Sequence, residues 1–301
     1  MNALVKAAAN AVALAHPKKG ESLLVVTDEP TMEIGAAIYE AAQKKCRATM
    51  FIIEPTGQSG REPPSLAAEA MRNADIVYCP TKYSLTHTEA ARAAKAAGAT
   101  VATLPGITRG VFIRGMSADY SRIKRDTTRL GKKLARARKA RVIANGTDIT
   151  FGLAGCKIQN DDGDLHRKSI HNLPGGESGV APKKANGYFT AMDNHLTKKR
   201  VRFTVRNNRV IGVDNARLRK KLWSVKNATN VAEFSIGTNP SARLSGNVLE
   251  DEKVLGTCHI AVGDSKSMGG RVRAELHWDY IIQKPTIWLG KRKIMDGGRM
   301  R

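Results

Sequence analysis

Two histidines and a carboxylate near the end of the sequence have the types and spacing of metal ligands. His259 lies in an apolar run, residues 258–262, that is typical of a buried strand. His277 and Asp279 are two residues apart, so on a strand their side chains point to the same face. Two imidazoles and one carboxylate can bind Fe(II), and such N/O ligands also suit Zn and Mn. The spacing also fits an ordinary His277–Asp279 hydrogen bond and a satisfied core histidine, so both interpretations stay open.

Two further carboxylates stand in unusual surroundings. Glu177 follows Gly175 and Gly176, which permit unusual backbone angles and close approach, as a carboxylate at a tight site would require. Glu233 lies inside the apolar run 231–236, where an unpaired carboxylate would be costly unless it is paired or bound to a metal. An exposed Glu177 on a Gly-rich surface loop is the alternative.

The second half of the sequence must position these residues, and its pattern is that of strands separated by turns. We expect strands at 141–144, 149–153, 157–158, 187–192, 201–205, 209–213 and 233–236, and a last strand pair within 285–295. Asn207 and Asn208 indicate a hairpin turn, and residues 215–225 indicate a helix. The prediction is an α+β domain over residues 141–301 that holds the whole metal site.

In the first half, strands and helices alternate. Apolar runs at 23–27, 48–53, 75–79 and 100–104 are separated by helical patterns at 31–45, 66–72 and 86–97. Thr31 and Thr86 are the expected N-caps, and Gly98 is the expected end of the third helix. This alternation predicts a doubly wound, Rossmann-like α/β domain over residues 1–140. No glycine-rich nucleotide fingerprint follows any of these strands.

Length and composition set the class of protein. A chain of 301 residues is long enough for two domains, and its 42% apolar content is ordinary for a globular protein. Four widely spaced cysteines, without a CxxC pair, predict free thiols in a reducing compartment, hence a cytoplasmic location. No apolar run approaches a membrane span, and residues 1–16 favour an amphipathic helix over a signal peptide.

The net charge of +23 is the compositional oddity. Its densest part is residues 122–141, where ten Lys or Arg accompany one acid, Asp126. We expect a basic helix over 119–139 that connects the two halves and exposes a solvated face. Such charge attracts polyanions through phosphate contacts, so nonspecific binding is expected. Aromatic content is only 5%, and no base-stacking or recognition-helix motif accompanies the charge.

Several separated motifs, in order, resemble the aminopeptidase T-like metallopeptidases, often labelled leucyl aminopeptidase. The resemblance covers about residues 20–300. The motifs are Asn172-Leu-Pro-Gly-Gly-Glu177 with Val180-Ala-Pro182, Asn186-Gly187, Glu233-Phe-Ser-Ile-Gly-Thr-Asn-Pro240, Gly246-Asn-Val-Leu-Glu-Asp-Glu-Lys-Val-Leu-Gly-Thr-Cys-His259, and His277-Trp-Asp279. In the first half they are Pro80-Thr-Lys-Tyr-Ser-Leu-Thr-His87 and Leu104-Pro-Gly-Ile-Thr108.

The resemblance implies a homodimeric two-metal exopeptidase that removes N-terminal residues from peptides. It implies that the metal ligands are Glu177, Glu233, His259, His277 and Asp279. The ions implied are Zn, Co or Mn, with Fe(II) as the alternative. A metal pair can lower the pKa of a water molecule and polarise the peptide carbonyl, with Glu177 or Glu252 as general base.

One departure from the family pattern opens a second interpretation. The founding peptidases carry a Tyr ligand a few residues after the first histidine, whereas residues 263–268 here contain none. A related branch uses one Fe(II), held by two His and one Asp, to cleave hydroxylated pyridine rings. His259, His277 and Asp279 would satisfy that requirement without Glu177 or Glu233. A polyanion-binding protein on the same scaffold is the third hypothesis.

Overall fold

Apolar runs early in the chain form a parallel sheet in the computed structural model, which describes residues 2–165, 168–266 and 268–301. The strands are β1 (Ser22–Asp28), β2 (Arg47–Ile53), β3 (Ile76–Thr81), β4 (Thr100–Pro105) and β8 (Ile170–Asn172). Their order is β2-β1-β3-β4-β8, and all neighbours are parallel.

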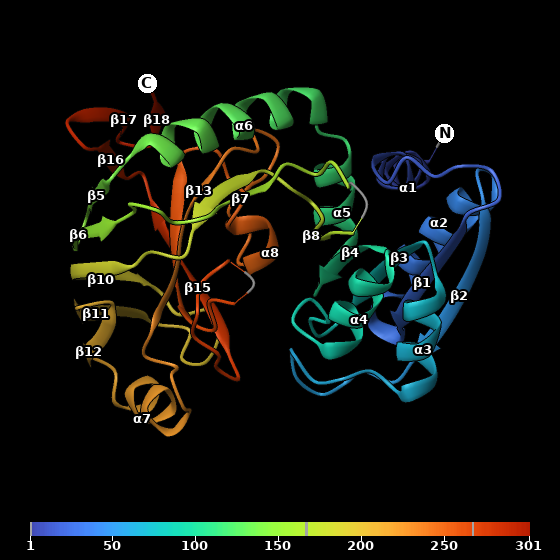
Figure 1. The fold of residues 1–301 in the computed structure, drawn as a ribbon, viewed down its shortest axis with the longest axis horizontal. Coiled ribbons are helices and arrows are strands. Elements are labelled where there is room, and N and C mark those ends of the chain that lie inside the picture. Colours follow the sequence, from blue (N-terminus) through green and yellow to red (C-terminus); the bar gives the residue numbers. More distant parts are fainter. Residues whose placement is uncertain (1, 166–167, 267) are drawn as a thin grey trace. The chain divides into compact units, whose positions relative to one another are not determined.

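Helices cover both faces of this sheet. Successive strand residues point to opposite faces, and apolar residues on both faces need to be buried. The helices are α1 (Ala3–Leu14), η1 (Glu29–Thr31), α2 (Met32–Gln43), α3 (Ser65–Asn73), α4 (Glu89–Ala97) and α5 (Arg109–Met116). Val77 and Cys79 pack in one core with residues of α3 and α4. Tyr78, between them, faces α1 and donates a hydrogen bond to the Ala11 carbonyl at 2.6 Å. These features confirm the predicted doubly wound domain (Figure 1).

Three details of this α/β domain differ from expectation. Helix α4 begins at Glu89 and is capped by Thr88, whose hydroxyl accepts from the Ala91 amide at 3.2 Å; Thr86 instead bonds Thr103, at 2.8 Å. Helix α5 was not predicted, because two Arg and two Gly among its eight residues leave too few apolar positions to show a helical period. Strand β8 was not predicted either, because three residues are too few to show a period.

The later part of the chain forms two antiparallel sheets. One has the strands β5 (Lys139–Ala144), β6 (Thr147–Gly152), β10 (Lys184–Met192), β11 (Arg200–Arg206), β12 (Arg209–Val213), β16 (Thr286–Leu289), β17 (Arg292–Asp296) and β18 (Arg299–Met300). The other has β7 (Ile158–Asp161), β9 (Glu177–Val180), β13 (Val231–Gly237), β14 (Thr257–Gly263) and β15 (His277–Gln283). Their orders are β12-β11-β10-β6-β5-β16-β17-β18 and β15-β14-β13-β9-β7.

Aromatic side chains between these two sheets form the core. Phe151 of β6 stacks on Phe234 of β13, with ring centroids 4.5 Å apart. The ring centroids of Tyr280 on β15 and Phe203 on β11 are 4.6 Å apart, so this pair also packs one sheet against the other. The short helices α7 (Ala216–Ser224) and α8 (Val248–Asp251) complete this α+β arrangement, which the sequence predicted. The predicted hairpin is present, and Asn207 and Asn208 both have positive φ.

The chain divides into two compact units. The first comprises Met1–Lys124, Gly163–Gly175 and Ser241–Arg243, and the second comprises the remaining residues. Residue 140, where we expected the division, falls inside the second unit. Residues 163–175 belong to the first unit because β8 pairs with β4.

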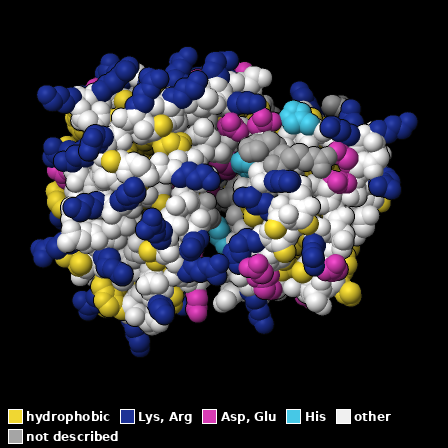
Figure 2. Space-filling model, in the orientation of Figure 1, with side chains coloured by type: hydrophobic (Ala, Val, Ile, Leu, Met, Phe, Trp, Pro, Cys, Tyr) yellow, Lys and Arg dark blue, Asp and Glu magenta, His cyan; other side chains and the backbone are white. Residues whose placement is uncertain are grey.

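The predicted basic helix is α6 (Tyr120–Arg136). Its apolar residues Ile123, Leu130 and Leu134 are buried, whereas most of its Lys and Arg side chains are exposed, as expected for a solvated basic face. Figure 2 shows Lys and Arg side chains spread over the visible surface, with acidic side chains far fewer. All four cysteines are free thiols. Within the described residues, no helix combines the length and apolarity needed to cross a membrane.

We expect any binding of nucleic acid to this surface to be independent of base sequence and strongly weakened by salt. The reason is that exposed Lys and Arg contact phosphates and release counterions, which gives a roughly 10³–10⁵-fold loss of affinity between about 50 and 200 mM salt for 6–10 phosphate contacts. Fluorescence anisotropy with two unrelated oligonucleotides over a salt series measures this. Tight, salt-resistant binding to one of the two sequences would contradict the expectation.

Candidate metal centre

Strands β13, β14 and β15 each divide their side chains between the core and a polar face. In β13, Phe234 and Ile236 enter the core, and Glu233 and Ser235 point the other way. The same alternation puts Ile260 of β14 and Tyr280 of β15 in the core. Their alternating partners on the polar face are His259, His277 and Asp279. Strand periodicity therefore gathers the candidate residues on one face of the five-stranded sheet.

The register between the strands places the candidate residues next to one another across the sheet. Ser235 lies opposite His259, and Ala261 lies opposite both Glu233 and Asp279. The small Ala261 side chain leaves room between the two carboxylates. Gly179, opposite Ser235, is also required to be small, since an added Cβ would lie 1.5 Å from the Ser235 hydroxyl oxygen.

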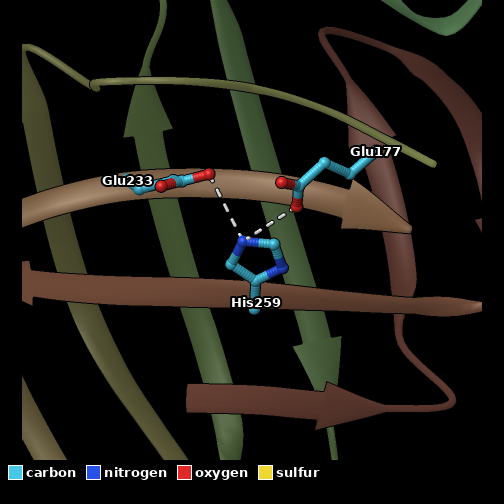
Figure 3. Close-up of side chains that lie close together, drawn as sticks. All are labelled: Glu177, Glu233 and His259. Atoms are coloured by element: carbon cyan, nitrogen blue, oxygen red, sulfur yellow. Dashed lines mark hydrogen bonds and ion pairs between the residues drawn. The ribbon is translucent and has the colours of Figure 1, made fainter. Parts of the chain in front are cut away.

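His259 stands between two glutamates (Figure 3). Its Nε2 atom is 3.3 Å from Glu177 Oε2 and 3.3 Å from Glu233 Oε1, and it lies 3.8 Å from Asp279 Oδ1. The Ser235 hydroxyl donates a hydrogen bond to Glu233 Oε1 and so fixes that carboxylate. His259 is 1% exposed, so these charges interact in surroundings from which water is largely excluded.

His277 completes the cluster from the edge strand. Its Nε2 atom is 3.2 Å from Glu233 Oε2 and 3.4 Å from Asp279 Oδ1. The Nδ1 atom lies 2.6 Å from the Asp264 carbonyl, which can only accept, so Nδ1 carries a proton and Nε2 faces the carboxylates. Such an outer hydrogen bond is the usual means of orienting a metal-binding imidazole. The two oxygens of Glu233 thus face one imidazole each.

A fourth acid, Glu252, and a lysine adjoin the cluster of Glu177, Glu233 and Asp279 with the two histidines. Ligand atoms of Glu252, His259 and Asp279 lie within 4.8 Å of one another. Next in the chain, the Lys253 ammonium is 2.9 Å from Glu252 Oε1 and 3.2 Å from Asp161 Oδ2, and it also donates to Glu177 Oε1. Lys253 is 0% exposed. The candidate centre therefore contains a fixed internal cation.

The charges shift the pKa values of these groups in opposite directions. Burial opposes the positive charge on His259, but Glu177, Glu233 and Asp279 together raise its pKa to about 10. Burial would raise the pKa of Glu233, but His259 and His277 hold it well below its usual range. Burial raises the pKa of Glu252 despite the nearby ammonium. Without a metal, protonated imidazoles therefore balance the carboxylates.

The donor atoms fit a divalent cation. Within the described part of the chain, neither Glu177 Oε2 nor Asp279 Oδ1 accepts a hydrogen bond, although both are buried. A buried carboxylate oxygen without a donor is costly, and a cation contacting both oxygens would offset that cost. Imidazole nitrogen with carboxylate oxygen is a donor set that suits Zn, Mn, Co and Fe(II).

Metal affinity is expected to rise with pH between about 6 and 9. The pKa of His259 is about 10 in the metal-free protein, so over this range a cation must displace the imidazole proton, and that competition weakens as pH rises. Calorimetric titration with Zn in buffers of different ionisation enthalpy measures both the affinity and the protons released. An affinity that does not change with pH, with no proton release, would contradict this arrangement.

The five residues expected as ligands, Glu177, Glu233, His259, His277 and Asp279, come together at one place, with Glu252 beside them. The sequence interpretation missed Lys253, Asp161 and the orienting Ser235 and Asp264. The adjacent pair Glu252-Lys253 beside an apolar strand was the available signal for Lys253. In the stretch 263–268, where the Tyr is missing, Ser267 lies outside the described residues.

The sequence matches no protein-family model, and no curated protein is significantly similar to it. Similarity appears among solved structures. A 2,5-dihydroxypyridine dioxygenase from Pseudomonas putida is 16% identical, with a TM-score of 0.82 over 99% of this chain and 96% of that one. AmpT from Thermus thermophilus is 14% identical, with a TM-score of 0.70 over 99% of this chain and 98% of that one. The chain thus shares, over nearly its whole length, the fold of an aminopeptidase T and of a ring dioxygenase.

Proposed function

We propose that this protein is a metal-dependent aminopeptidase. The observation that carries the proposal is the convergence of two imidazoles and three carboxylates on one buried sheet face, with contacts of 3.2–3.8 Å. Two independent considerations add support: the ordered motifs that resemble aminopeptidase T-like enzymes, and the fold shared with AmpT. The substrate would be a peptide with a free N-terminus.

Each residue has a defined part in this proposal. Glu177, Glu233, His259, His277 and Asp279 would hold divalent metal. A bound divalent cation would supply a water molecule of lowered pKa and polarise the scissile carbonyl. Glu233 is oriented by Ser235, and His277 is oriented by the Asp264 carbonyl.

Glu252 is suited to take and return the proton. It is not one of the five proposed ligands, yet its carboxylate lies in the same group of atoms as His259 and Asp279. Burial raises the pKa of Glu252, so its ionised carboxylate is a stronger base: it can accept a proton from the attacking water and, once protonated, deliver that proton to the departing amine. Glu177 is the alternative base, through Oε2, because Lys253 engages its Oε1.

A mononuclear Fe(II) ring-cleaving dioxygenase is the second candidate function. The observation that favours it is that Lys253 engages Glu177 and Glu252, whereas His259 and His277 both contact Asp279 and with it form a complete two-histidine, one-carboxylate set. The fold shared with the 2,5-dihydroxypyridine dioxygenase agrees with this candidate.

Metal content and two assays test both proposals. Protein purified without chelators would be analysed for Zn, Mn, Co and Fe, anaerobically for Fe(II), and then assayed on leucine-initiated peptides and on 2,5-dihydroxypyridine. Peptide hydrolysis restored by Zn, Mn or Co to chelated protein supports the aminopeptidase. Oxygen consumption with 2,5-dihydroxypyridine and Fe(II) supports the second candidate. If the protein shows neither activity with any of these metals, both proposals are contradicted. The expected homodimer and cytoplasmic location stay predictions.

A further inference from the structure

Lys253 is a charged side chain with no exposed surface in the middle of the candidate metal centre. Its ammonium contacts the carboxylates of Asp161, Glu177 and Glu252, which come from β7, β9 and the end of helix α8. An ammonium has three N–H donors and no acceptor, so three carboxylate oxygens satisfy it completely. The contacts therefore use one oxygen from each of three acids that surround the site.

The backbone on either side holds this ammonium in place. The Lys253 amide donates to the Glu250 carbonyl at 3.0 Å, and the Lys253 carbonyl accepts from the Asn239 amide at 2.8 Å. Gly237 permits this close approach, because a Cβ there would lie 2.8 Å from the Lys253 carbonyl carbon. Residue 253 is thus anchored to the end of β13, the strand that carries Glu233.

We infer that the Lys253 ammonium serves as the second cation of this pocket, so that the centre takes a single divalent ion on the side of His259, His277 and Asp279. The inference rests on the proposed metal-dependent function and specifies that the centre binds one divalent ion per chain. A second divalent ion would need carboxylate oxygens at about 2.0–2.2 Å. Asp161, Glu177 and Glu252, the acids on the side of the pocket away from His277, each already direct one oxygen to the Lys253 ammonium, so a positive charge lies where a second ion would bind.

The contacts of Lys253 support its assignment as a fixed cation. The side chain is 0% exposed, and its ammonium contacts carboxylates of three different acids, Asp161, Glu177 and Glu252. Displacing it would leave three buried carboxylates partly unpaired, which is strongly unfavourable.

Metal titration of the unaltered protein is the primary test. Chelated protein is titrated with Mn(II) by calorimetry, and the bound ion is examined by electron paramagnetic resonance. We expect one Mn(II) per chain and the spectrum of an isolated ion. Two ions per chain with an exchange-coupled spectrum would overturn the inference but leave the metal centre intact. No bound metal would overturn the proposed function itself, and the inference with it.

The variant Lys253→Met then tests the cause, with Lys220→Met on the exposed side of α7 as the matched control. Loss of the ammonium frees the three carboxylates, so Lys253→Met should bind two Mn(II) per chain and gain more thermal stability from excess Mn(II) than the parent does. Lys220→Met should bind one. A single Mn(II) in folded Lys253→Met would overturn the inference. If Lys253→Met does not fold, the stoichiometry of the unaltered protein decides.

Discussion

Replacing His277 with alanine is expected to weaken divalent-metal binding by more than about 100-fold and to reduce turnover to the background rate. Loss of a mere outer partner of a metal ligand costs about 10–100-fold, so loss of a ligand should cost more. His277 also faces both Glu233 and Asp279, at 3.2 and 3.4 Å, so its removal leaves these two carboxylates with His259 as their remaining imidazole partner. Equilibrium dialysis with Zn and the peptide assay measure the two effects.

Asp279→Asn is likewise expected to weaken divalent-metal binding and reduce turnover, without changing the shape of the side chain. The amide keeps the volume of the carboxylate but removes the negative charge that a divalent cation requires. His16→Ala and Asp296→Asn are matched controls, because both residues form ion pairs with residues outside the candidate centre, His16 with Asp164 and Asp296 with Arg301. The controls should bind Zn as the parent does. If His277→Ala and Asp279→Asn also bind Zn as tightly as the parent, the proposed metal centre is wrong.

The strands of the candidate centre were predictable because their pattern is local. Alternation around Phe234, Ile260 and Tyr280 requires one buried face, and the same period fixes His277 and Asp279 on the other. A carboxylate inside an apolar run, as at Glu233, indicates a paired or metal-bound group for reasons of solvation alone. The sequence therefore carried both the elements and the residue types of the site.

The adjacent pair Glu252-Lys253 was a signal for Lys253 itself, but the other carboxylate partners of its ammonium could not be predicted, because they depend on long-range register. Asp161 and Glu177 are opposite each other on β7 and β9, and nothing in the sequence near Lys253 indicates that pairing. The same limit applies to β8, whose three residues join a sheet formed about 65 residues or more earlier in the chain. The Thr86 prediction failed for a different reason: a second threonine two residues later offers the better cap.

Glu177→Gln is the substitution that best separates the two candidate reactions, because the two assign different roles to Glu177. In the aminopeptidase, Glu177 is a metal ligand or the general base, and loss of either role should lower peptide hydrolysis by at least about 10²–10⁴-fold. In the dioxygenase, the set of His259, His277 and Asp279 holds the iron, and Glu177 is dispensable for it. The glutamine keeps the shape of the side chain, and Lys253 retains Glu252 and Asp161 as partners.

The measurements are the rate on a leucine-initiated peptide with Zn, Mn or Co, and the Fe(II) content of anaerobically loaded protein. Glu275→Gln, on an exposed segment, is the matched control and should leave both unchanged. Lost hydrolysis in Glu177→Gln, against a parent that hydrolyses the peptide, supports the aminopeptidase. Retained Fe(II), in a protein that consumes oxygen with the pyridine, supports the dioxygenase. Undiminished peptide hydrolysis by Glu177→Gln would exclude Glu177 both as an essential ligand and as the general base. Glu252 would then be the remaining candidate for the general base.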